Sequence, residues 1–410
     1  MTILSHKIRL TPNATQRVAF GRASGCARFS WNWALARYSE LKASGVARVS
    51  MNDLKKEFNS LKKEQFPWIY ESPKDCNQQP FANLQKALKR CYETKGASRR
   101  VGFPKFKHKG EHDSFYLSND KFEVSDHSVR LPVIGSVKMT EALRFQGKIL
   151  SGTVSRVADD WFLSVQVQLP DDYQRETVDS TTTVGVDLGL KTFAVTSDGA
   201  EIVAPKPLKA NLKRLRRLSR RHSRKVKGSN NRKKSCSHLA KLHQHISNIR
   251  KDFIHKLTSK LLRENQTVVI EDLSLAGMLQ LWGRAVSDVG FAETRRQLEY
   301  KAPLYRRNLV VADRFFPSTK MCCECGTIKV KMGLDEREYV CEKCGVITPR
   351  DLNAALNLRD YGVVFLNKLG TASAEVKPVE IPALAAPKGE VKLRSMKQES
   401  QSEHLCSLRK

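Results

Sequence analysis

Four cysteines in two pairs constrain this chain more than any other feature. Cys322 with Cys325 and Cys341 with Cys344 form two CxxC pairs, fifteen residues apart, and a glycine follows each pair. Two such turns present four thiolates at tetrahedral spacing, and the glycine lets the backbone curl so that its N–H groups face the sulfurs. The spacing predicts one structural zinc ion, because four thiolates leave no open position for a substrate.

The remaining cysteines fit this interpretation. Cys323 lies inside the first pair, but its side chain is expected to point away from the metal, and the others are scattered singly. A redox role is the alternative for any CxxC pair, and two facing pairs disfavour it. The pattern therefore favours metal binding over disulfide bonding.

The charge balance predicts a polyanionic partner. The 410 residues include 72 Lys and Arg against 42 Asp and Glu, a net charge of +30 with a pI of about 9.9. A surface this basic binds nucleic acid by releasing counterions, so binding should weaken as salt rises. A membrane is the alternative partner, but no apolar run approaches the roughly 18 residues of a spanning helix, and the start lacks the apolar core of a signal peptide. We expect a cytoplasmic protein without membrane contact.

The first 170 residues indicate a β-barrel with an early helical insertion. An alternating segment predicts a strand through Leu10, after which Thr11 as N-cap and Pro12 as first residue open a helix. Apolar residues keep helical spacing to about Thr94. Residues 114–169 then alternate as strands, with a hairpin turn at Asp159 and Asp160.

A basic loop lies between these two parts. Residues 99–109, RRVGFPKFKHK, interleave cations with two phenylalanines around a glycine and a proline. Cations meet phosphates and rings stack on bases, so the loop suits a nucleic-acid backbone. The alternative is a basic surface turn over two core phenylalanines. The candidate nucleic-acid ligands here are Arg99, Arg100, Phe103, Lys105 and Lys107.

A second basic stretch follows a hairpin with Asp198 and Gly199 at its turn. Residues 206–263 hold 20 Lys or Arg and one acid, Asp252, above leucines and isoleucines at helical spacing. The pattern predicts two helices joined by a loop at residues 228–230. Because the charge is almost entirely positive, a nucleic-acid partner is favoured over a merely solvated helix face. The candidate ligands are Lys213, Arg217, Arg221 and Lys225.

Three acids stand where catalysis would need them. Asp187 ends the buried strand that begins at residue 184, and Glu271 ends a second apolar strand, residues 267–270. Asp351 lies in the first turn of a helix for which Thr348 is the expected N-cap and Pro349 the first residue. Carboxylates at the ends of neighbouring core strands converge, so we expect the three to share one site.

Three converging acids imply bound cations, since an unpaired buried carboxylate is costly. Mg²⁺ suits hard oxygen ligands, and two ions about 4 Å apart would support in-line phosphodiester hydrolysis. Taken singly, Asp187 could be a turn residue and Asp351 an acid favoured by the helix dipole. Asp272 should point away from Glu271 and serve a structural role. The combined pattern matches an RNase H-like nuclease core.

These motifs resemble those of TnpB, the RNA-guided nuclease family of bacterial insertion sequences related to type V CRISPR effectors. The first and second RuvC-like motifs are matched by VGVDLGLKTFAV and VVIEDLSLAGM. FAETRRQLEYKA, DRFFPSTKMCCECG and DLNAALNL follow in family order, and GFPKFKHK matches a further signature. The sequence departs from the family at Pro349, where an acid is common, and after Met278, where the segment is shorter and less basic.

The resemblance implies catalytic ions on Asp187, Glu271 and Asp351 and zinc on the four cysteines. It implies a multidomain α+β fold: a β-barrel wedge domain (1–10 and 95–180) with an inserted helical recognition unit (11–94), an RNase H-like RuvC α/β nuclease domain (181–317 and 346–370) with an inserted zinc ribbon (318–345), and a disordered tail (371–410). The expected protein is a monomer in a bacterial or archaeal cell, nucleoid-associated on its target. It would carry a guide RNA from the transposon end, recognise a short flanking motif and cut double-stranded DNA with two Mg²⁺ ions.

The sequence is also compatible with three other functions. An RNA-guided DNA-binding regulator that no longer cuts would be expected to lose one of the three acids. A strand-joining transposase could use the same fold, so the acids alone do not exclude it. A basic zinc-ribbon protein that binds structured RNA would leave DNA intact.

Overall fold

The computed structural model describes residues 2–94, 101–171, 173, 175, 177, 181–333 and 335–368. The chain divides into two compact units, residues 1–173 and 174–410. Each is described here by itself. The predicted disordered tail, residues 371–410, lies outside the described residues.

Unit 1 is built on a four-stranded antiparallel sheet. Its order is β1 (Ile3–Leu10), β7 (Asp160–Gln168), β6 (Lys148–Val157) and β2 (Ser114–Ser118). The predicted hairpin is confirmed, since β6 and β7 pair directly, but its turn consists of Ala158 and Asp159 because Asp160 already belongs to β7. A second sheet has the order β3 (Glu123–Ser125), β4 (Ser128–Leu131) and β5 (Gly135–Lys138), and a bridge from Leu10 to Met139 links it to the end of β1.

Three helices are inserted between β1 and β2. They are α1 (Ala14–Ala43), α2 (Met51–Gln65) and α3 (Asp75–Glu93), with short 3-10 turns η1 (Pro67–Glu71) and η2 (Asn119–Lys121) nearby. The prediction that Thr11 caps α1 is wrong. Asn13 is the N-cap, because its side chain accepts the N–H of Gln16 while the Gln16 side chain accepts the N–H of Asn13.

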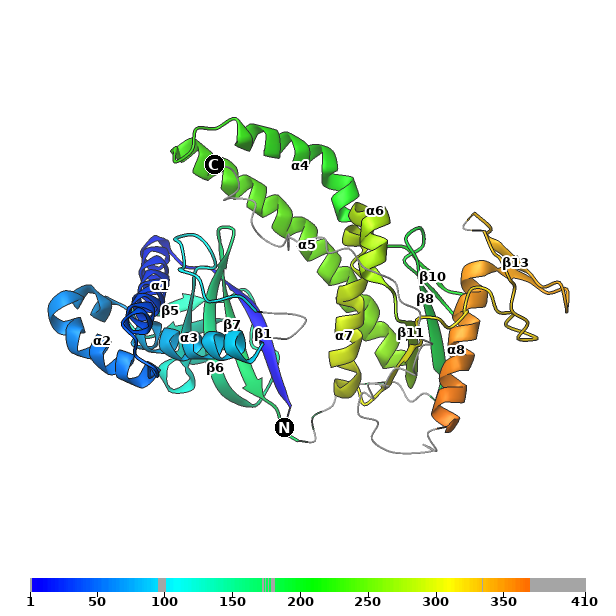
Figure 1. Cartoon of the computed structure of the whole chain (residues 1–410), viewed down its shortest axis with the longest axis horizontal. Coiled ribbons are helices and arrows are strands. Elements are labelled where there is room, and N and C mark those ends of the chain that lie inside the picture. Colours follow the sequence, from blue (N-terminus) through cyan, green and yellow to red (C-terminus); the bar gives the residue numbers. More distant parts are fainter. Residues whose placement is uncertain are drawn as a thin grey trace. The chain divides into compact units, whose positions relative to one another are not determined.

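The inserted helices lie beside the sheet (Figure 1), and one hydrophobic core joins them to it. Phe20 of α1 packs on Trp161 of β7 with ring centroids 5.0 Å apart, and the ring of Phe58 of α2 lies 5.3 Å from that of Phe81 of α3. All four side chains are buried. The inserted helices are therefore part of the same packed unit as the sheet.

Unit 2 contains a five-stranded sheet. Its order is β10 (Glu201–Ile202), β9 (Ala194–Thr196), β8 (Thr183–Leu188), β11 (Thr267–Glu271) and β12 (Asn308–Ala312). Strands β8, β11 and β12 are parallel, whereas β9 is antiparallel to both of its neighbours. The predicted turn after β9 is confirmed: Gly199 has a φ of +86° and donates to the carbonyl of Thr196.

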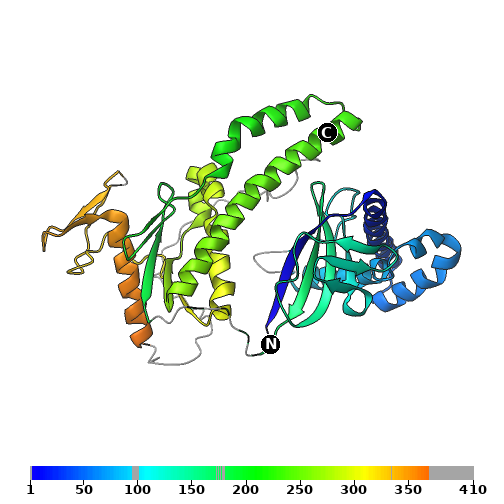
Figure 2. The same ribbon diagram turned by 180° about the vertical axis from the view of Figure 1, so that it is seen from behind.

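Helices cover both faces of this sheet (Figures 1 and 2). One face carries α8 (Arg350–Lys368), and the opposite face carries α5 (Asn230–Glu264) and α7 (Phe291–Leu304). The expected cap of α8 is wrong, since Thr348 and Pro349 belong to β14 (Ile347–Pro349), which pairs with β13 (Glu338–Val340). Asp351 is nevertheless in the first turn of the helix, as predicted.

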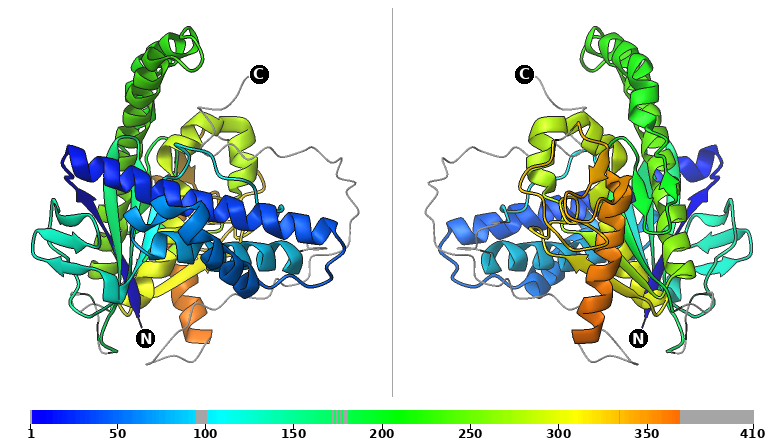
Figure 3. Two further views of the ribbon diagram at one scale, coloured as in Figure 1. Left: turned by 90° about the vertical axis from the view of Figure 1, so that its left-hand side faces the viewer. Right: turned by 90° about the vertical axis from the view of Figure 1, so that its right-hand side faces the viewer.

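The two basic helices form a hairpin that projects from the sheet (Figure 3). They are α4 (Pro207–Ser223) and α5, as the sequence predicted. The buried carboxylate of Asp288, in α6 (Leu275–Val289), accepts the N–H groups of Leu208 and Lys209 at the start of α4, while Arg250 of α5 donates to it. One acid thus fixes three helices at the base of the hairpin.

Within the described residues, none of the helices combines the length and the apolar character needed to cross a membrane.

Candidate active site and metal centre

Two of the predicted acids lie at the ends of neighbouring parallel strands, Glu271 as the last residue of β11 and Asp187 as the last but one of β8. In the β8–β11 pair, Val186 lies opposite Ile270, and Asp187 and Glu271 are the next residue on each strand. Adjacent strands are about 4.8 Å apart. The sheet therefore brings these two acids to the same edge, and both are half-buried there.

Helix α8 brings the third acid to the same place. A Cβ at Gly185 of β8 would overlap the carbonyl oxygen of Ala355, so glycine permits α8 to lie directly on the strand. Asp351 is one helical turn before Ala355, roughly 6 Å along the axis. Asp187 is two residues after Gly185, roughly 6.6 Å along the strand. Because Gly362 of α8 also meets Thr183 at the start of β8, helix and strand run antiparallel, and Asp351 is carried towards Asp187.

The electrostatics of the site couple the three acids. Burial and, after it, the charges of Glu271 and Asp351 together raise the pKa of Asp187 to about 8, whereas Arg350 acts in the opposite direction. Burial also raises the pKa of Glu271, against a hydrogen bond from Ser318 that lowers it. An ionised carboxylate is therefore costly at this edge unless a cation is present.

The donor set fits a hard divalent cation. Three carboxylates supply the oxygen ligands that Mg²⁺ prefers, and a cation among them would remove the cost of ionising Asp187. Among the described residues, the three acids do not form a group as tight as the four cysteines, whose ligand atoms all lie within 4.8 Å of one another.

Sequence reasoning missed the polar contacts that hold Glu271. The hydroxyl of Ser318 donates to Glu271 Oε1, and Ser318 is itself 3% exposed. Asn357 of α8 donates to the carbonyl of Ser318 at 2.7 Å. The signal that could have found them is the pair of asparagines in DLNAALNL, because buried amides in a helix need partners outside it.

Asp272 has the structural role that the sequence predicted. Its carboxylate accepts from Arg295 and, at 2.7 Å, from Arg314. The neighbouring acids Glu271 and Asp272 thus have different partners, since Ser318 donates to Glu271 and two arginines donate to Asp272.

The four cysteines gather as predicted. Cys322 Sγ lies 3.6 Å from Cys344 Sγ, and Cys325 Sγ lies 3.5 Å from Cys341 Sγ. Four thiolates around a zinc ion at about 2.3 Å would be about 3.8 Å apart at tetrahedral angles. The group is therefore nearly preformed for that ion, and Cys323 is not part of it.

The two cysteine turns share one backbone geometry. Gly326 and Gly345 have φ values of +71° and +72°, and each donates to the carbonyl of the first cysteine of its pair. The fully buried Tyr339 packs between the turns and donates to the carbonyls of Lys320 and Thr327. The positive φ explains why glycine follows each pair.

The predicted basic residues of α4 form one face of the helix. A hollow of about 490 Å³ runs along that face and is lined only by cations: Lys213, Arg216, Arg217, Arg220, Arg221 and Arg224. Their spacing of three and four residues places them on one side. Lys225 lies beyond the end of α4 and does not line the hollow. The sequence prediction missed Arg216, Arg220 and Arg224 because it followed a spacing of four only.

The basic loop after α3 is fastened to α1. Trp31 donates to the carbonyl of Lys105, and the side chain of Asn32 pairs with both backbone groups of Lys107. Phe103 and Phe106 are 47% and 51% exposed, so the alternative of two core phenylalanines is wrong. Arg99 and Arg100 lie outside the described residues.

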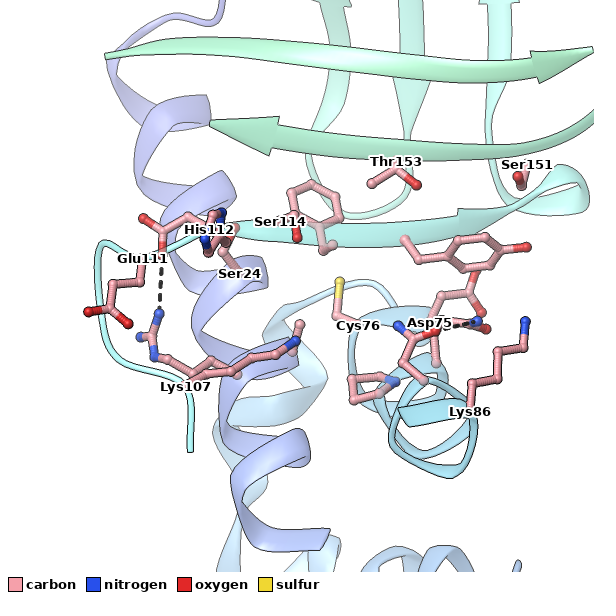
Figure 4. Close-up of a pocket in the computed structure, with 18 of the residues that line it drawn as sticks. Ser24, Asp75, Cys76, Lys86, Lys107, Glu111, His112, Ser114, Ser151 and Thr153 are labelled. Atoms are coloured by element: carbon pink, nitrogen blue, oxygen red, sulfur yellow. Dashed lines mark hydrogen bonds and ion pairs between the residues drawn. The ribbon is translucent and has the colours of Figure 1, made fainter. Parts of the chain in front are cut away.

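Unit 1 also contains a polar hollow that the sequence did not predict (Figure 4). Its volume is about 320 Å³, and α1, α3, the loop before β2 and the sheet surround it. Two of its acids are paired: Asp75 accepts from Ser118, and Asp113 accepts from Arg28 and Arg156. The remaining lining includes amides, hydroxyls and a lysine: Gln79, Asn83, Lys86, Tyr116, Thr153 and Gln166.

Three family models match this chain. One described as a probable transposase matches residues 163–281, one described as a Cas12f1-like TNB domain matches 291–358, and one described as a helix-turn-helix domain matches 1–46. In the described part of that last range the structure has strand β1 and one continuous helix, α1.

Curated relatives match over most of their length. A putative RNA-guided DNA endonuclease of Streptomyces pristinaespiralis is 34% identical over 87% of this chain and 89% of its own. The putative RNA-guided DNA endonuclease InsQ of Escherichia coli strain K12 is 30% identical over 87% of this chain and 91% of its own.

A solved structure shares the fold. The protein of a Cas12f1–sgRNA–target DNA complex, solved by cryo-EM, matches with a TM-score of 0.55 and 17% identity, over 84% of this chain and 82% of the other. At this identity the likeness concerns architecture alone. The extent and the identity of the sequence matches show that this chain belongs to the TnpB family.

Proposed function

We propose that this protein is an RNA-guided DNA endonuclease that hydrolyses phosphodiester bonds at Asp187, Glu271 and Asp351. The observation that carries the proposal is the convergence of the three acids, which two strand ends and one helix start bring to a single sheet edge. The names of the full-length relatives support the same activity.

The three carboxylates would hold two Mg²⁺ ions. Ions bound there would supply the activation of water and the stabilisation of the leaving 3′ oxygen. The raised pKa of Asp187 supports this assignment, because that carboxyl gains most from a nearby cation. The four cysteines would hold one zinc ion that serves structure and not catalysis.

We interpret unit 2 as an RuvC-like nuclease domain. The sheet order, with three parallel strands and an antiparallel pair at one edge, supports an RNase H-like core, and the zinc ribbon at 318–345 interrupts it between β12 and α8. Unit 1 would be a wedge domain with its helical recognition unit inserted after β1. The expected boundaries, 180 for the wedge domain and 94 for the inserted unit, form part of this proposal.

Nucleic acid would contact both units. The exposed cations of α4 suit the backbone of the guide RNA, which we propose derives from the transposon end, and the loop at 101–109 offers cations with exposed rings. The polar hollow of unit 1 suits the reading of base edges in a duplex beside the target, since amides and lysine match their donors and acceptors. We propose that the protein acts as a monomer.

The test uses the protein co-expressed with its flanking element DNA. Co-purified RNA is sequenced, and the complex is incubated with matching plasmids that carry randomised flanks, with Mg²⁺ or with EDTA. The expected result is Mg²⁺-dependent cutting beside one enriched flank, and loss of cutting in Asp187→Ala with RNA binding retained.

The other outcomes favour the other candidates. RNA-dependent binding without cutting would support a regulator, and products linked to transposon ends would support a strand-joining transposase. Absence of bound RNA, with DNA left intact under every condition, would contradict guided cleavage altogether. An Asp187→Ala protein that no longer binds RNA would contradict the assignment of that residue to catalysis.

A further inference from the structure

The segment that leads from β12 into the zinc ribbon touches a proposed catalytic acid. Ser318 lies in this segment with 3% of its surface exposed, and its hydroxyl donates to Glu271 Oε1. The hydroxyl is hydrogen-bonded to one of the two carboxylate oxygens, so the other oxygen can bind a further partner. Hydrogen bonds to an ionised carboxylate are the stronger kind, so this contact restrains a flexible glutamate side chain.

Two buried asparagines of α8 hold the same segment. Asn357, 2% exposed, donates at 2.7 Å to the carbonyls of both Ser318 and Met321. Asn353 is fully buried, donates to the Met321 carbonyl at 2.7 Å and accepts the N–H of Cys323 at 3.0 Å. Buried amides are costly without partners, and here the described contacts satisfy them by fixing a loop.

The same helix therefore carries one acid and orients another. Asp351 lies two residues before Asn353, and Cys323 follows the zinc-ligand position Cys322. A continuous set of hydrogen bonds runs from the first cysteine turn through α8 and Ser318 to Glu271. Partners of this kind orient the residues that bind a metal directly.

We infer that Ser318 is a positioning residue that holds the Glu271 carboxylate ready for a divalent cation, and that Asn357 holds Ser318 in place for it. This inference rests on the proposed function, since it assigns a metal to Glu271. Ser318 itself is not expected to touch the cation or the substrate.

The experiment measures Mn²⁺ binding by the zinc-loaded full-length protein with isothermal titration calorimetry. Ser318→Ala should weaken Mn²⁺ binding by roughly 10- to 100-fold, the usual effect of losing such a partner. Ser318→Thr keeps the hydroxyl and should stay within about threefold of the parent. Asn357→Ala should weaken binding in the same direction. The Mg²⁺ concentration that gives half-maximal plasmid cutting should rise in parallel.

The controls separate positioning from folding. Ser60→Ala removes an exposed hydroxyl that donates to the Glu57 carbonyl, and it should change nothing. Zinc content and melting temperature should match the parent in Ser318→Ala, which excludes a collapsed ribbon as the cause.

Two results would overturn the inference. One is Mn²⁺ binding by Ser318→Ala equal to that of the parent, and the other is a folded Ser318→Thr as weak as Ser318→Ala. Glu271→Gln distinguishes this failure from failure of the proposed function. If Glu271→Gln also binds Mn²⁺ and cuts DNA normally, the carboxylate site is assigned wrongly. If Glu271→Gln loses Mn²⁺ binding while Ser318→Ala keeps it, only the role of Ser318 is rejected.

Discussion

Asp187 and Glu271 each lie one residue beyond Val186 and Ile270, a matched pair on two adjacent parallel strands. The register of the sheet therefore sets which acids meet. A shift of one residue in either strand would turn the acid to the other face. Helix α8 lies so close to β8 that only glycine fits beneath it at position 185.

Gly185→Ala should destabilise unit 2 and reduce cutting strongly. The new Cβ would overlap the Ala355 carbonyl oxygen and lie 2.5 Å from the Arg359 nitrogen, both of them backbone atoms that cannot swing aside. Overpacking of this kind costs about 1–3 kcal/mol or more. Thermal unfolding measures the effect. Gly283→Ala is the matched control, because nothing lies within 4 Å of its Cβ, and equal melting of the two variants would contradict the close packing of α8.

Asp187→Asn should stabilise the protein in EDTA at neutral pH. The unfolded carboxyl ionises above its ordinary pKa of 3.8, whereas the folded one has a pKa of about 8. Ionisation of Asp187 thus favours the unfolded state. The resulting loss of folding stability is absent below pH 4 and grows until about pH 8. Because Asp187 is partly exposed, the effect is reduced by solvent screening. We expect Asp187→Asn to raise the free energy of unfolding by roughly 1–2 kcal/mol, which corresponds to a rise of several degrees in Tm.

The pH dependence checks the sign of this effect. The melting temperatures of parent and Asp187→Asn should converge near pH 4 and separate as the pH rises, and Mg²⁺ should stabilise the parent only. A constant difference between the two proteins from pH 4 to pH 8 would reject the shifted pKa of Asp187 as its cause.

The acids could be predicted because each stands at a point that sequence marks clearly. Glu271 is the last residue of one apolar strand, Asp187 is the last but one of another, and Asp351 lies in the first turn of a helix. Ser318 and Asn357 could not be found in this way, because their partners are carbonyls and a carboxylate from distant segments. The two asparagines of DLNAALNL indicate buried amides, but which groups they contact becomes known only with the tertiary packing.

The local errors have similar causes. Thr11 and Pro12 are typical residues of a helix start. The helix nevertheless begins after Asn13, because Asn13 and Gln16 form a capping box. The lining of the polar hollow of unit 1 comes from five segments of the chain between Ser24 and Gln166, so no local pattern could reveal it. The exposure of Phe103 likewise depends on how the loop is fastened to α1.

Cys341→Ser should lose zinc and destabilise the ribbon. Three thiolates bind zinc less tightly than four, and Cys341 is 2% exposed beside the buried Tyr339, so its loss also affects the ribbon core. Metal content by mass spectrometry and thermal unfolding measure the two effects. Cys323→Ser is the matched control, since Cys323 is outside the ligand group and should retain zinc. Full zinc content in Cys341→Ser would show that the ligands are assigned wrongly.

Asn83→Ala should change the flank that the protein prefers while leaving its catalytic rate on an optimal target within a small factor. Asn83 is exposed in the hollow of unit 1 and accepts a hydrogen bond from Gln79 at 3.3 Å, so both amides are placed to meet a base edge together. Each lost base contact costs about 1–3 kcal/mol of discrimination. Plasmids with randomised flanks measure the change, with Gln85→Ala, an exposed α3 residue outside the hollow, as control. An unaltered preference in Asn83→Ala would place flank reading elsewhere.

Arg220→Gln should weaken RNA binding and flatten its salt dependence. Arg220 lines the all-cationic hollow on α4, whereas Arg214 is exposed on the same helix but outside the hollow, which makes Arg214→Gln a control of equal charge. Each lost phosphate contact should reduce the slope of log affinity against log salt by about 0.7–0.9. Filter binding of the co-purified RNA from 50 to 300 mM salt, roughly the range where this term dominates, measures both quantities. Equal slopes for the two variants would mean that α4 contributes only net charge, because a general electrostatic attraction does not depend on the face of the helix that carries the cation.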